Sequence, residues 1–290
     1  MDPGNEIDQE MKAMIEIDTG TEELLCRIQD RVGVITLNKP HKKNALGDIL
    51  TPALRRTVVT LEEDDRVGCV MITGAGDAFC SGGDVSGMGG GGSRSEKPSQ
   101  PVKSKKDLIA ELTHKQVTLT LRIHELAKVT IAALPGAAAG AGLSIALACD
   151  LRVASSKAFV TTAFRNIGLS GDYGGSWFLP RLIGLAKAKE LYYTADRVDA
   201  EEGARLGIFN KVFPEDTFRE DALAYAARIA NGPTNALGRM KINLNRGINQ
   251  SLRESLVLEA QHLIGSAGNN ESKEAISAFM EKRMPEFHKG

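Results

Sequence analysis

Short apolar runs rich in β-branched residues alternate with stretches of helical periodicity from residue 22 onward, and this alternation limits the fold more than any other feature. The runs Leu24–Gln29 and Val32–Leu37 are separated by Asp30-Arg31, a turn signal that predicts a hairpin. Strands that alternate with helices are typical of layered sheets, so the pattern predicts an α/β fold. Further strands are predicted over 67–72, 129–134, 151–154 and 158–161, and helices over 44–61, 106–126, 141–149 and near 185–195, 217–230, 234–247 and 251–265.

The composition excludes several classes of protein. The 290 residues are 42% hydrophobic and 25% charged, which is typical of a globular chain with a sizeable core. A formal net charge of −1 gives no basic surface for nucleic acid or an anionic membrane. No apolar run reaches the roughly 20 residues that span a bilayer, and the acidic first residues lack the hydrophobic stretch of a secretory signal. We therefore expect a cytoplasmic protein with no nucleic-acid or membrane partner.

The cysteines and histidines show no metal-binding spacing. The cysteines lie far apart and are interpreted as reduced thiols in a cytosolic compartment. The histidines form no ligand pattern either, so no metal site is expected. The residues concerned are Cys26, Cys69, Cys80 and Cys149, and His41, His114, His124, His262 and His288.

Changes in composition divide the chain into three parts. Residues 1–21 are acidic and without periodicity, and they predict a flexible N-terminal segment. Residues 22–213 hold the alternating strands and helices and predict the core. Within the core, a glycine- and serine-rich stretch cannot bury apolar surface, which predicts a mobile loop over 86–106. Residues 214–290 contain several amphipathic spans and predict a helical C-terminal region.

Two glycine-rich segments are the candidates for chemistry. The first, residues 79–84 (FCSGGD), follows a predicted strand, and the second, residues 135–142 (PGAAAGAG), joins a strand to a helix. Small residues let the backbone approach a ligand, and amides at a helix start have no partner within the helix. Two such amides on one carbonyl oxygen would form an oxyanion hole. Tight packing and a phosphate cradle remain alternatives, although neither segment matches the P-loop or the dinucleotide-binding pattern.

The order of several motifs resembles the crotonase (enoyl-CoA hydratase/isomerase) superfamily over roughly residues 22–284. The resemblance implies a spiral of ββα repeats and a helical C-terminal region that forms a trimer or hexamer. It also implies a coenzyme A thioester as the substrate, with no prosthetic group. The motifs are LNKP (37–40) with Asn44-Ala45, FCSGGD, Cys149-Asp150, Ile167-Gly168, Gly174-Gly175, LPRLIG (179–184), AEEGA (200–204) and AFMEKR (278–283).

The resemblance assigns roles to several residues. It places the oxyanion hole at the backbone amides of Gly83 and Ala141, beside Gly82, where an alanine amide donates as well as the usual glycine. It places the adenine of coenzyme A against the backbone near Ser81. The phosphates would meet basic side chains, namely Lys42 or Lys43, and Lys282 from a neighbouring subunit.

The two glutamates that family hydratases use to hold a water are missing. The first position aligns with Ser144 and the second with Phe164, and neither side chain can act as a general base. Hydration is therefore not the expected reaction. Ser144 is instead a candidate to hydrogen-bond substrate or water, and Phe164 and Trp177 are candidates to line the acyl pocket.

Asp172 is the candidate base. Its position, four residues after Gly168, resembles that of the aspartate in dienoyl-CoA isomerases and ring-opening epoxyacyl-CoA isomerases. The neighbours Phe164, Tyr173 and Trp177 would raise the pKa of its carboxyl by desolvation. One base suffices to remove a proton and return it to another carbon, which predicts an enoyl-CoA isomerase. The competing structural interpretation is an Asx turn or a helix N-cap.

Other reactions stay open. The aspartate of haloaroyl-CoA dehalogenases, which attacks as a nucleophile, aligns with Asp172, but their histidine aligns with Val117, and His114 lies one turn earlier. A naphthoate-synthase-like ring closure and a hydratase with an unrecognised carboxylate are further enzymatic alternatives. A silent relative with a structural or RNA-associated role is disfavoured by the intact glycines and by Asp172.

Overall fold

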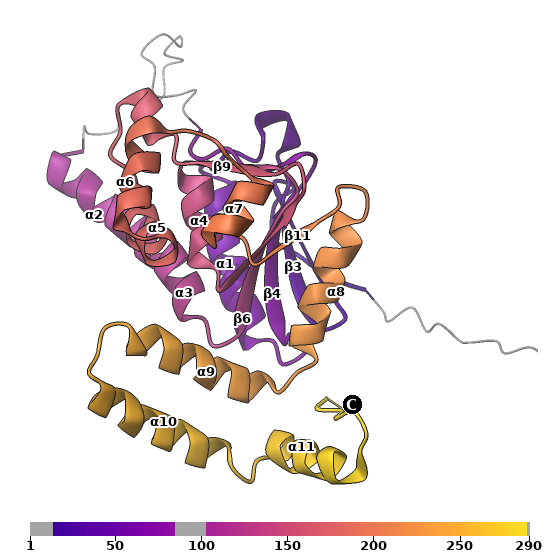
Figure 1. Cartoon of the computed structure of the whole chain (residues 1–290). Helices are drawn as coiled ribbons and strands as arrows, with labels where there is room; N and C mark the ends of the chain where they lie inside the picture. The colour runs from indigo at the N-terminus through magenta and orange to yellow at the C-terminus, as the bar shows by residue number, and fades with distance from the viewer. Residues whose placement is uncertain (1–13, 85–102, 289–290) are drawn as a thin grey trace, which may run out of the picture.

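The computed structural model describes residues 14–84 and 103–288. Within them, a twisted sheet of seven strands stands beside a sheet of four shorter strands, and helices cover both (Figure 1). The larger sheet has the order β1-β2-β3-β4-β6-β8-β11. Its strands are β1 (Ile15–Ile17), β2 (Leu24–Gln29), β3 (Val32–Leu37), β4 (Cys69–Gly74), β6 (Val129–Leu134), β8 (Leu151–Ser155) and β11 (Lys211–Phe213).

The larger sheet begins as an antiparallel hairpin and continues in parallel. β2 and β3 pair over their full predicted lengths, and Asp30 and Arg31 take positive φ angles of 50° and 63°, as a two-residue hairpin turn requires. From β3 to β11 the strands are parallel. All six residues of β4 are buried, which is typical of a parallel strand covered on both faces.

Alternate residues of the parallel strands supply two separate apolar cores. On one face, residues such as Val34, Met71 and Ile131 pack against α8 (Phe218–Ala230). That helix presents Phe218, Ala222, Ala226 and Ala230 at a spacing of four, a single narrow face. On the other face, the intervening residues pack against α1 (Leu50–Glu63), α4 (Ala141–Ala148) and α5 (Gly175–Ile183).

The smaller sheet brings the two glycine-rich segments together. Its order is β10-β9-β7-β5, from β10 (Val198–Asp199), β9 (Phe159–Thr161), β7 (Ala137–Ala139) and β5 (Ala78–Cys80). β5 leads into the first segment and β7 into the second, and the two strands are parallel neighbours. The segments therefore leave the sheet at the same edge. Close backbone approach is needed there, because a Cβ on Gly142 would stand 2.3 Å from the Cys80 carbonyl oxygen.

Gly142→Ala is expected to lower the free energy of unfolding by about 1–3 kcal/mol, because the added methyl overlaps a backbone that cannot move aside cheaply. Gly83→Ala is the matched control, since no heavy atom lies within 4 Å of its Cβ position. Urea unfolding of the two variants checks this prediction. Equal stabilities would show that the segments pack more loosely than the structure indicates.

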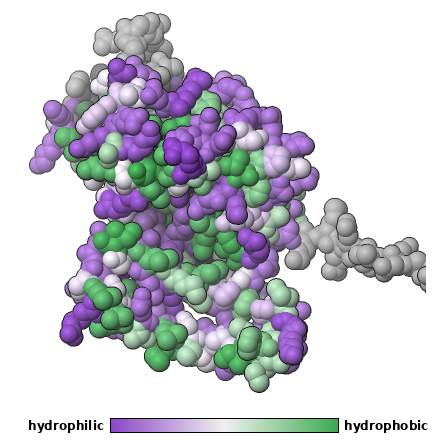
Figure 2. Space-filling model, viewed as in Figure 1, coloured by the Kyte–Doolittle hydropathy of each residue, from purple (hydrophilic) through white to green (hydrophobic). Residues whose placement is uncertain are grey.

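Three helices form a layer below the sheets (Figure 1). They are α9 (Thr234–Gly247), α10 (Leu252–Ser266) and α11 (Asn270–Glu281). A buried ion pair fastens α9 to the core: Lys241 Nζ lies 2.8 Å from Asp150 Oδ2, and Asp150 also accepts from Thr130. Figure 2 shows hydrophobic side chains gathered over these helices, in the lower half of the view. The exposed apolar side chains on these helices include Leu252, Ile264, Phe279 and Met280.

The remaining helices connect the strands. α2, a π-helical turn and α3 run on as one segment that agrees with the helix predicted over 106–126. α6 likewise agrees with the span predicted near 185–195. The elements are α2 (Lys105–Gln116), the π-helical turn Val117–Leu121, α3 (Arg122–Glu125), α6 (Leu185–Thr194), α7 (Ala200–Leu206) and the 3₁₀ turns Pro40–Lys42 and Phe164–Ile167.

Three expectations differ from the structure. The helix predicted over 44–61 begins at Leu50, because Asn44 takes a φ of 57° and turns its side chain onto Lys39 N, Ala75 O and Ala78 O. Within the flexible segment expected over 1–21, Ile15–Ile17 instead form β1, paired with β2. Most of the mobile loop expected over 86–106 lies outside the described residues, and its end belongs to α2.

Candidate active site

A single β-bridge between Leu46 and Gly83 fixes the orientation of the Gly83 amide. Leu46 N donates to Gly82 O at 2.8 Å, and Asp84 N donates to Leu46 O at 2.9 Å. Gly83 lies between these two bonds, so its own N–H faces the other way. Among the described residues that N–H has no hydrogen-bond partner, and the space at its Cβ position is empty to 4 Å. Residues 44–49, which leave the predicted helix, thus position the first amide.

The Ala141 amide opens helix α4. Gly140 precedes it with a φ of 51°, a conformation that favours glycine, and Ala141 N has no acceptor in the described part of the chain. The Cβ position of Gly82 lies 3.5 Å from Ala141 N, which places the two segments side by side. Both amides therefore line one cavity, and the positive end of the helix dipole adds to the attraction for an oxyanion.

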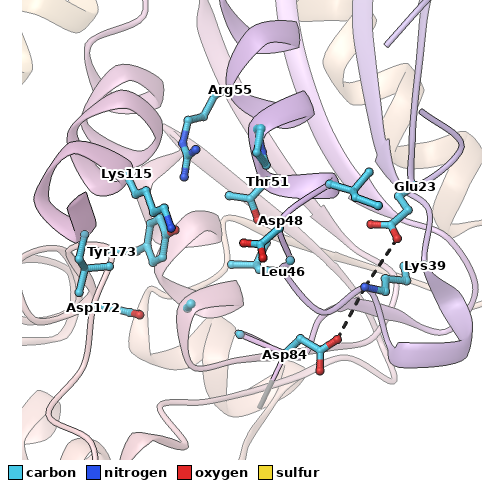
Figure 3. Close-up of a pocket in the computed structure, with 16 residues that line it drawn as sticks. Glu23, Lys39, Leu46, Asp48, Thr51, Arg55, Asp84, Lys115, Asp172 and Tyr173 are labelled. Atoms are coloured by element: carbon cyan, nitrogen blue, oxygen red, sulfur yellow. Dashed lines mark ion pairs between the residues drawn. The ribbon is translucent and has the colours of Figure 1, made fainter. Parts of the chain in front are cut away.

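The cavity has two lobes that share Gly83, Asp84, Ala141 and Asp172. Their volumes, about 590 and 550 Å³, are each large enough for part of a thioester substrate. What we call the apolar lobe is further lined by Lys42, Ala45, Ser81, Gly82, Gly140, Ala163, Phe164, Asn166, Ile167 and Leu169. What we call the polar lobe (Figure 3) is further lined by Glu23, Lys39, Leu46, Gly47, Asp48, Ile49, Thr51, Pro52, Arg55, Leu112, Lys115 and Tyr173.

The Asp172 carboxylate lies where the lobes meet. Burial raises its pKa from 3.8 to about 6, the direction that the sequence predicts. Its Oδ1 is buried and has no hydrogen-bond partner within the described residues. The preceding residue, Gly171, has a φ of 107° and packs against Phe164 and Tyr192. Burial and then the Asp172 charge raise the pKa of Tyr192 to about 12, so that hydroxyl stays protonated beside the carboxylate.

Charged side chains opposite Asp172 are tied to one another. Lys39 Nζ lies 3.7 Å from both Glu23 and Asp84, and Lys42 lies 2.8 Å from Asp84 (Figure 3 shows the first two pairs). Lys43 lies outside both lobes and pairs with Asp77 at 2.7 Å. Of the two lysines considered for the phosphates, Lys42 is the one that the structure brings to the cavity.

Besides Lys43, three residues singled out from the sequence do not line either lobe. Trp177, expected to line the acyl pocket, lines a separate pocket with Lys241. Its ring centroid lies 3.7 Å from the Arg181 guanidinium carbon, and the ring contacts His124. Ser144 is 1% exposed, and its hydroxyl donates to Gly140 O at 3.3 Å. Lys282 ends α11 on the surface, so its expected role depends on a neighbouring subunit.

Sequence reasoning missed two of the three residues that give the polar lobe its character, and it named the third, Tyr173, only as an apolar neighbour of Asp172. Arg55 comes from α1, Lys115 from α2 and Tyr173 from the residue after the candidate base. Tyr173 is 7% exposed and has a φ of 52°, which a bulky residue rarely adopts. A tyrosine between Gly171 and Gly174 was the available signal, since flanking glycines often mark an irregular turn.

Two comparisons decide the family. A profile described as enoyl-CoA hydratase/isomerase matches residues 27–290. The 1,2-epoxyphenylacetyl-CoA isomerase of Escherichia coli (strain K12) is 32% identical over 266 residues, covering 92% of this chain and 98% of that protein. This chain belongs to the enoyl-CoA hydratase/isomerase family. It is an acyl-CoA enzyme of that family and has the crotonase fold.

Other members of the family differ in reaction. The 4-chlorobenzoyl coenzyme A dehalogenase-1 of Arthrobacter sp is 32% identical and covers 88% of this chain and 89% of its own length. The crystal structure of an enoyl-CoA hydratase from Polaromonas sp. JS666 has a TM-score of 0.81 at 32% identity, covering 91% of this chain and 98% of that one. Family membership therefore fixes the acyl-CoA substrate class, and the side chains at the cavity must decide the reaction.

The described residues add three further observations. They contain no group of three or more histidine, cysteine or carboxylate side chains that could hold a metal ion. Among the same residues, no helix is both long and apolar enough to cross a membrane. The four cysteines are buried and unpaired, and burial raises the pKa of Cys80, within the first glycine-rich segment, to about 12. That thiol is therefore no candidate nucleophile at neutral pH.

Proposed function

We propose that this chain is an acyl-CoA isomerase in which Asp172 removes a proton from an activated acyl carbon and returns it to another. The Gly83 and Ala141 amides would hold the thioester oxygen as its negative charge develops. The Asp172 carboxylate is the observation that carries the proposal. Its Oδ1 is buried and has no hydrogen-bond partner among the described residues. Asp172 lines both lobes, together with the two residues whose amides have no partner there. A base near pH 7 needs the raised pKa that burial produces here.

The two lobes would divide the substrate. Lys42 and Ser81, which the resemblance associates with coenzyme A, line the apolar lobe, so we assign that lobe to the coenzyme A arm. Phe164 also lines this lobe, on the side of Asp172. The acyl group would then extend past Gly83 and Ala141 into the polar lobe. This placement puts the carbons next to the thioester beside Asp172.

Hydration is the second candidate function, and one observation favours it. Asp48 is exposed in the polar lobe and could hold a water with Asp172. The residues at the positions of the hydratase glutamates cannot do so, because Ser144 is buried outside both lobes and Phe164 is apolar. The nucleophilic alternative lacks an activator, since no histidine lines either lobe in the described part of the chain.

The fall of kcat/KM at low pH should give the pKa of the catalytic base. Because Asp172 must be ionised to accept a proton and its pKa lies near 6, we expect activity to fall about tenfold for each pH unit below about 6 and to be flat above 7. Steady-state rates with one substrate between pH 4.5 and 8.5 test this. A fall with an apparent pKa near 4 would mean that the working carboxyl is a solvated one.

A substrate panel tests the proposed reaction. We would incubate the protein with enoyl-, dienoyl-, epoxyaryl- and haloaroyl-CoA thioesters in oxygen-18 water and read the products by mass spectrometry. An isomerase rearranges a thioester without a change in mass. Gain of water would establish the hydratase alternative, and oxygen-18 in the enzyme's own aspartate would establish the nucleophilic one.

We also propose that the C-terminal helices associate with further copies of the chain. Exposed apolar side chains on α10 and α11, such as Leu252, Ile264 and Phe279, support this, because soluble monomers seldom carry such surfaces in contiguous patches. A trimer would be the unit in which Lys282 could reach a neighbouring site. Light scattering of the purified protein tests it, and a monomeric mass would contradict it.

A further inference from the structure

The polar lobe contains a guanidinium that the protein itself leaves incompletely satisfied. Arg55 points from α1 into the lobe, on the same side as Lys115 and Tyr173 (Figure 3). Its Nε is buried and has no hydrogen-bond partner, and Arg55 forms no ion pair among the described residues. The rest of the Arg55 side chain lines the lobe and carries a positive charge that no carboxylate of these residues neutralises, so an anionic group of a ligand can pair with it. Arg55 is thus a candidate to bind part of the substrate.

The nearby groups hold Arg55 in place without neutralising it. The Tyr173 hydroxyl lies within hydrogen-bonding reach of Arg55; burial raises the pKa of Tyr173, and the guanidinium opposes that rise. A hydroxyl contact leaves the positive charge intact. Among the described residues no ion pair joins Arg55 to Asp172, whose buried Oδ1 has no hydrogen-bond partner there.

The backbone conformation at Tyr173 directs its hydroxyl toward Arg55. The φ of 52° turns the ring into the lobe, and the Tyr173 amide donates to Gln116 Oε1 at 2.7 Å, which fixes the turn to α2. Lys115 adds a second positive charge to the same wall, shared with Glu111 at 2.7 Å. The other wall is the chain Glu23–Lys39–Asp84, in which one lysine bridges two carboxylates. Of the basic side chains that line the lobe, Lys39 and Lys115 are paired with carboxylates, whereas Arg55 forms no ion pair among the described residues.

We infer that Arg55, supported by Tyr173 and Lys115, binds a carboxylate at the far end of the acyl group, so that the enzyme acts on CoA thioesters of dicarboxylic acids. The planar guanidinium suits a carboxylate because it can donate two parallel hydrogen bonds. The inference rests on the proposed function, because that function places the acyl group in the polar lobe. Asp48, also in this lobe, is exposed and remains in solvent.

Binding of unreactive thioesters tests the inference separately from the chemistry. Titration calorimetry would compare glutaryl-, adipyl- and pimeloyl-CoA with valeryl-, hexanoyl- and heptanoyl-CoA, which match them in carbon number and cannot isomerise. We expect at least one dicarboxylic thioester to bind about tenfold or more tightly than its partner. Arg55→Met should abolish that preference and Arg55→Lys should keep part of it. Arg56→Met, the exposed neighbour on α1, should leave it unchanged.

Equal affinities in every pair for the wild-type protein would overturn the inference, and so would a preference that survives Arg55→Met. The wild-type comparison decides the matter even if Arg55→Met does not fold. Failure here would leave the substrate panel to judge the isomerase proposal on its own. Conversely, a dicarboxylic preference in a protein that hydrates its substrate would refute the proposed reaction and retain the role of Arg55.

Discussion

Asp172→Asn should lower the rate of isomerisation about a thousandfold, because the amide cannot accept the proton that the carboxylate removes. Binding of a saturated acyl-CoA should change less than threefold, since asparagine keeps the size of the side chain. Rates and titration calorimetry on the same preparation check both parts. Asp196→Asn, the same substitution at an exposed position, is the control and should keep the full rate.

The stability of the Asp172→Asn variant gives a second measure of the same carboxylate. The folded protein raises the pKa of Asp172 from 3.8 to about 6, so burial of the charge opposes folding above pH 6 and not below about pH 4. With a discount for its partial exposure, asparagine should add about 1 kcal/mol to the free energy of unfolding at pH 8. The gain should vanish toward pH 4. A variant less stable than wild type at pH 8 would mean that the carboxylate makes a structural contact.

Ala141→Pro should lower kcat about a hundredfold or more by deleting one donor of the oxyanion hole. Proline has no N–H, and the first position of a helix tolerates it because that N–H has no partner within the helix. Gly140, which precedes it, is the residue type least restricted by a following proline. The loss should fall on kcat, because the donor acts mainly on the charge of the transition state.

Ala141→Gly is the matched control, since it alters the side chain and retains the donor. It should keep kcat within a few-fold of wild type, and both variants should unfold at similar temperatures. If the glycine variant loses as much activity as the proline variant, the side chain of Ala141 matters and its amide does not. If neither loses activity, the thioester oxygen is bound elsewhere.

Local patterns were sufficient for elements whose residues are held by short-range contacts. The strands Leu24–Gln29, Val32–Leu37 and Val129–Leu134 have the predicted bounds. Each is a short apolar run with turn residues beside it, and that local signal is enough to mark a strand in a covered sheet. The strands β5, β7 and β10 span two or three residues, too few for a periodicity to show. Their formation depends on the neighbouring strands, which a local window does not include.

The start of α1 shows how a distant contact overrides helical periodicity. Residues 44–49 carry apolar residues at helical spacing, yet Leu46 forms a β-bridge with Gly83, and the Asn44 side chain bonds to Lys39, Ala75 and Ala78. The sequence patterns did not single out Arg55, although it lines the polar lobe and its Nε is buried. The sequence order alone therefore could not indicate an acyl-binding guanidinium.

The candidate site shows the same difference between what a local pattern predicts and what distant contacts decide. The family motifs located Gly83, Ala141 and Asp172, and the structure brings the three to one cavity. Packing decides the orientation of the Ser144 and Trp177 side chains. Ser144 is enclosed beside Gly175, and the Trp177 ring stacks against Arg181. A motif gives a position along the chain, and only the packed neighbours decide which way the side chain points.

Proton exchange measures the central claim most directly. The wild-type protein and Asp172→Asn would each be incubated in deuterium oxide with the substrate that the panel identifies, and deuterium on the acyl carbons would be read by mass spectrometry and NMR. We predict that wild-type protein incorporates deuterium at the carbons between which the double bond moves, without gain of water, and that Asp172→Asn binds the thioester and exchanges nothing above the uncatalysed rate. Exchange by Asp172→Asn at the wild-type rate would contradict the assignment of Asp172 as the base.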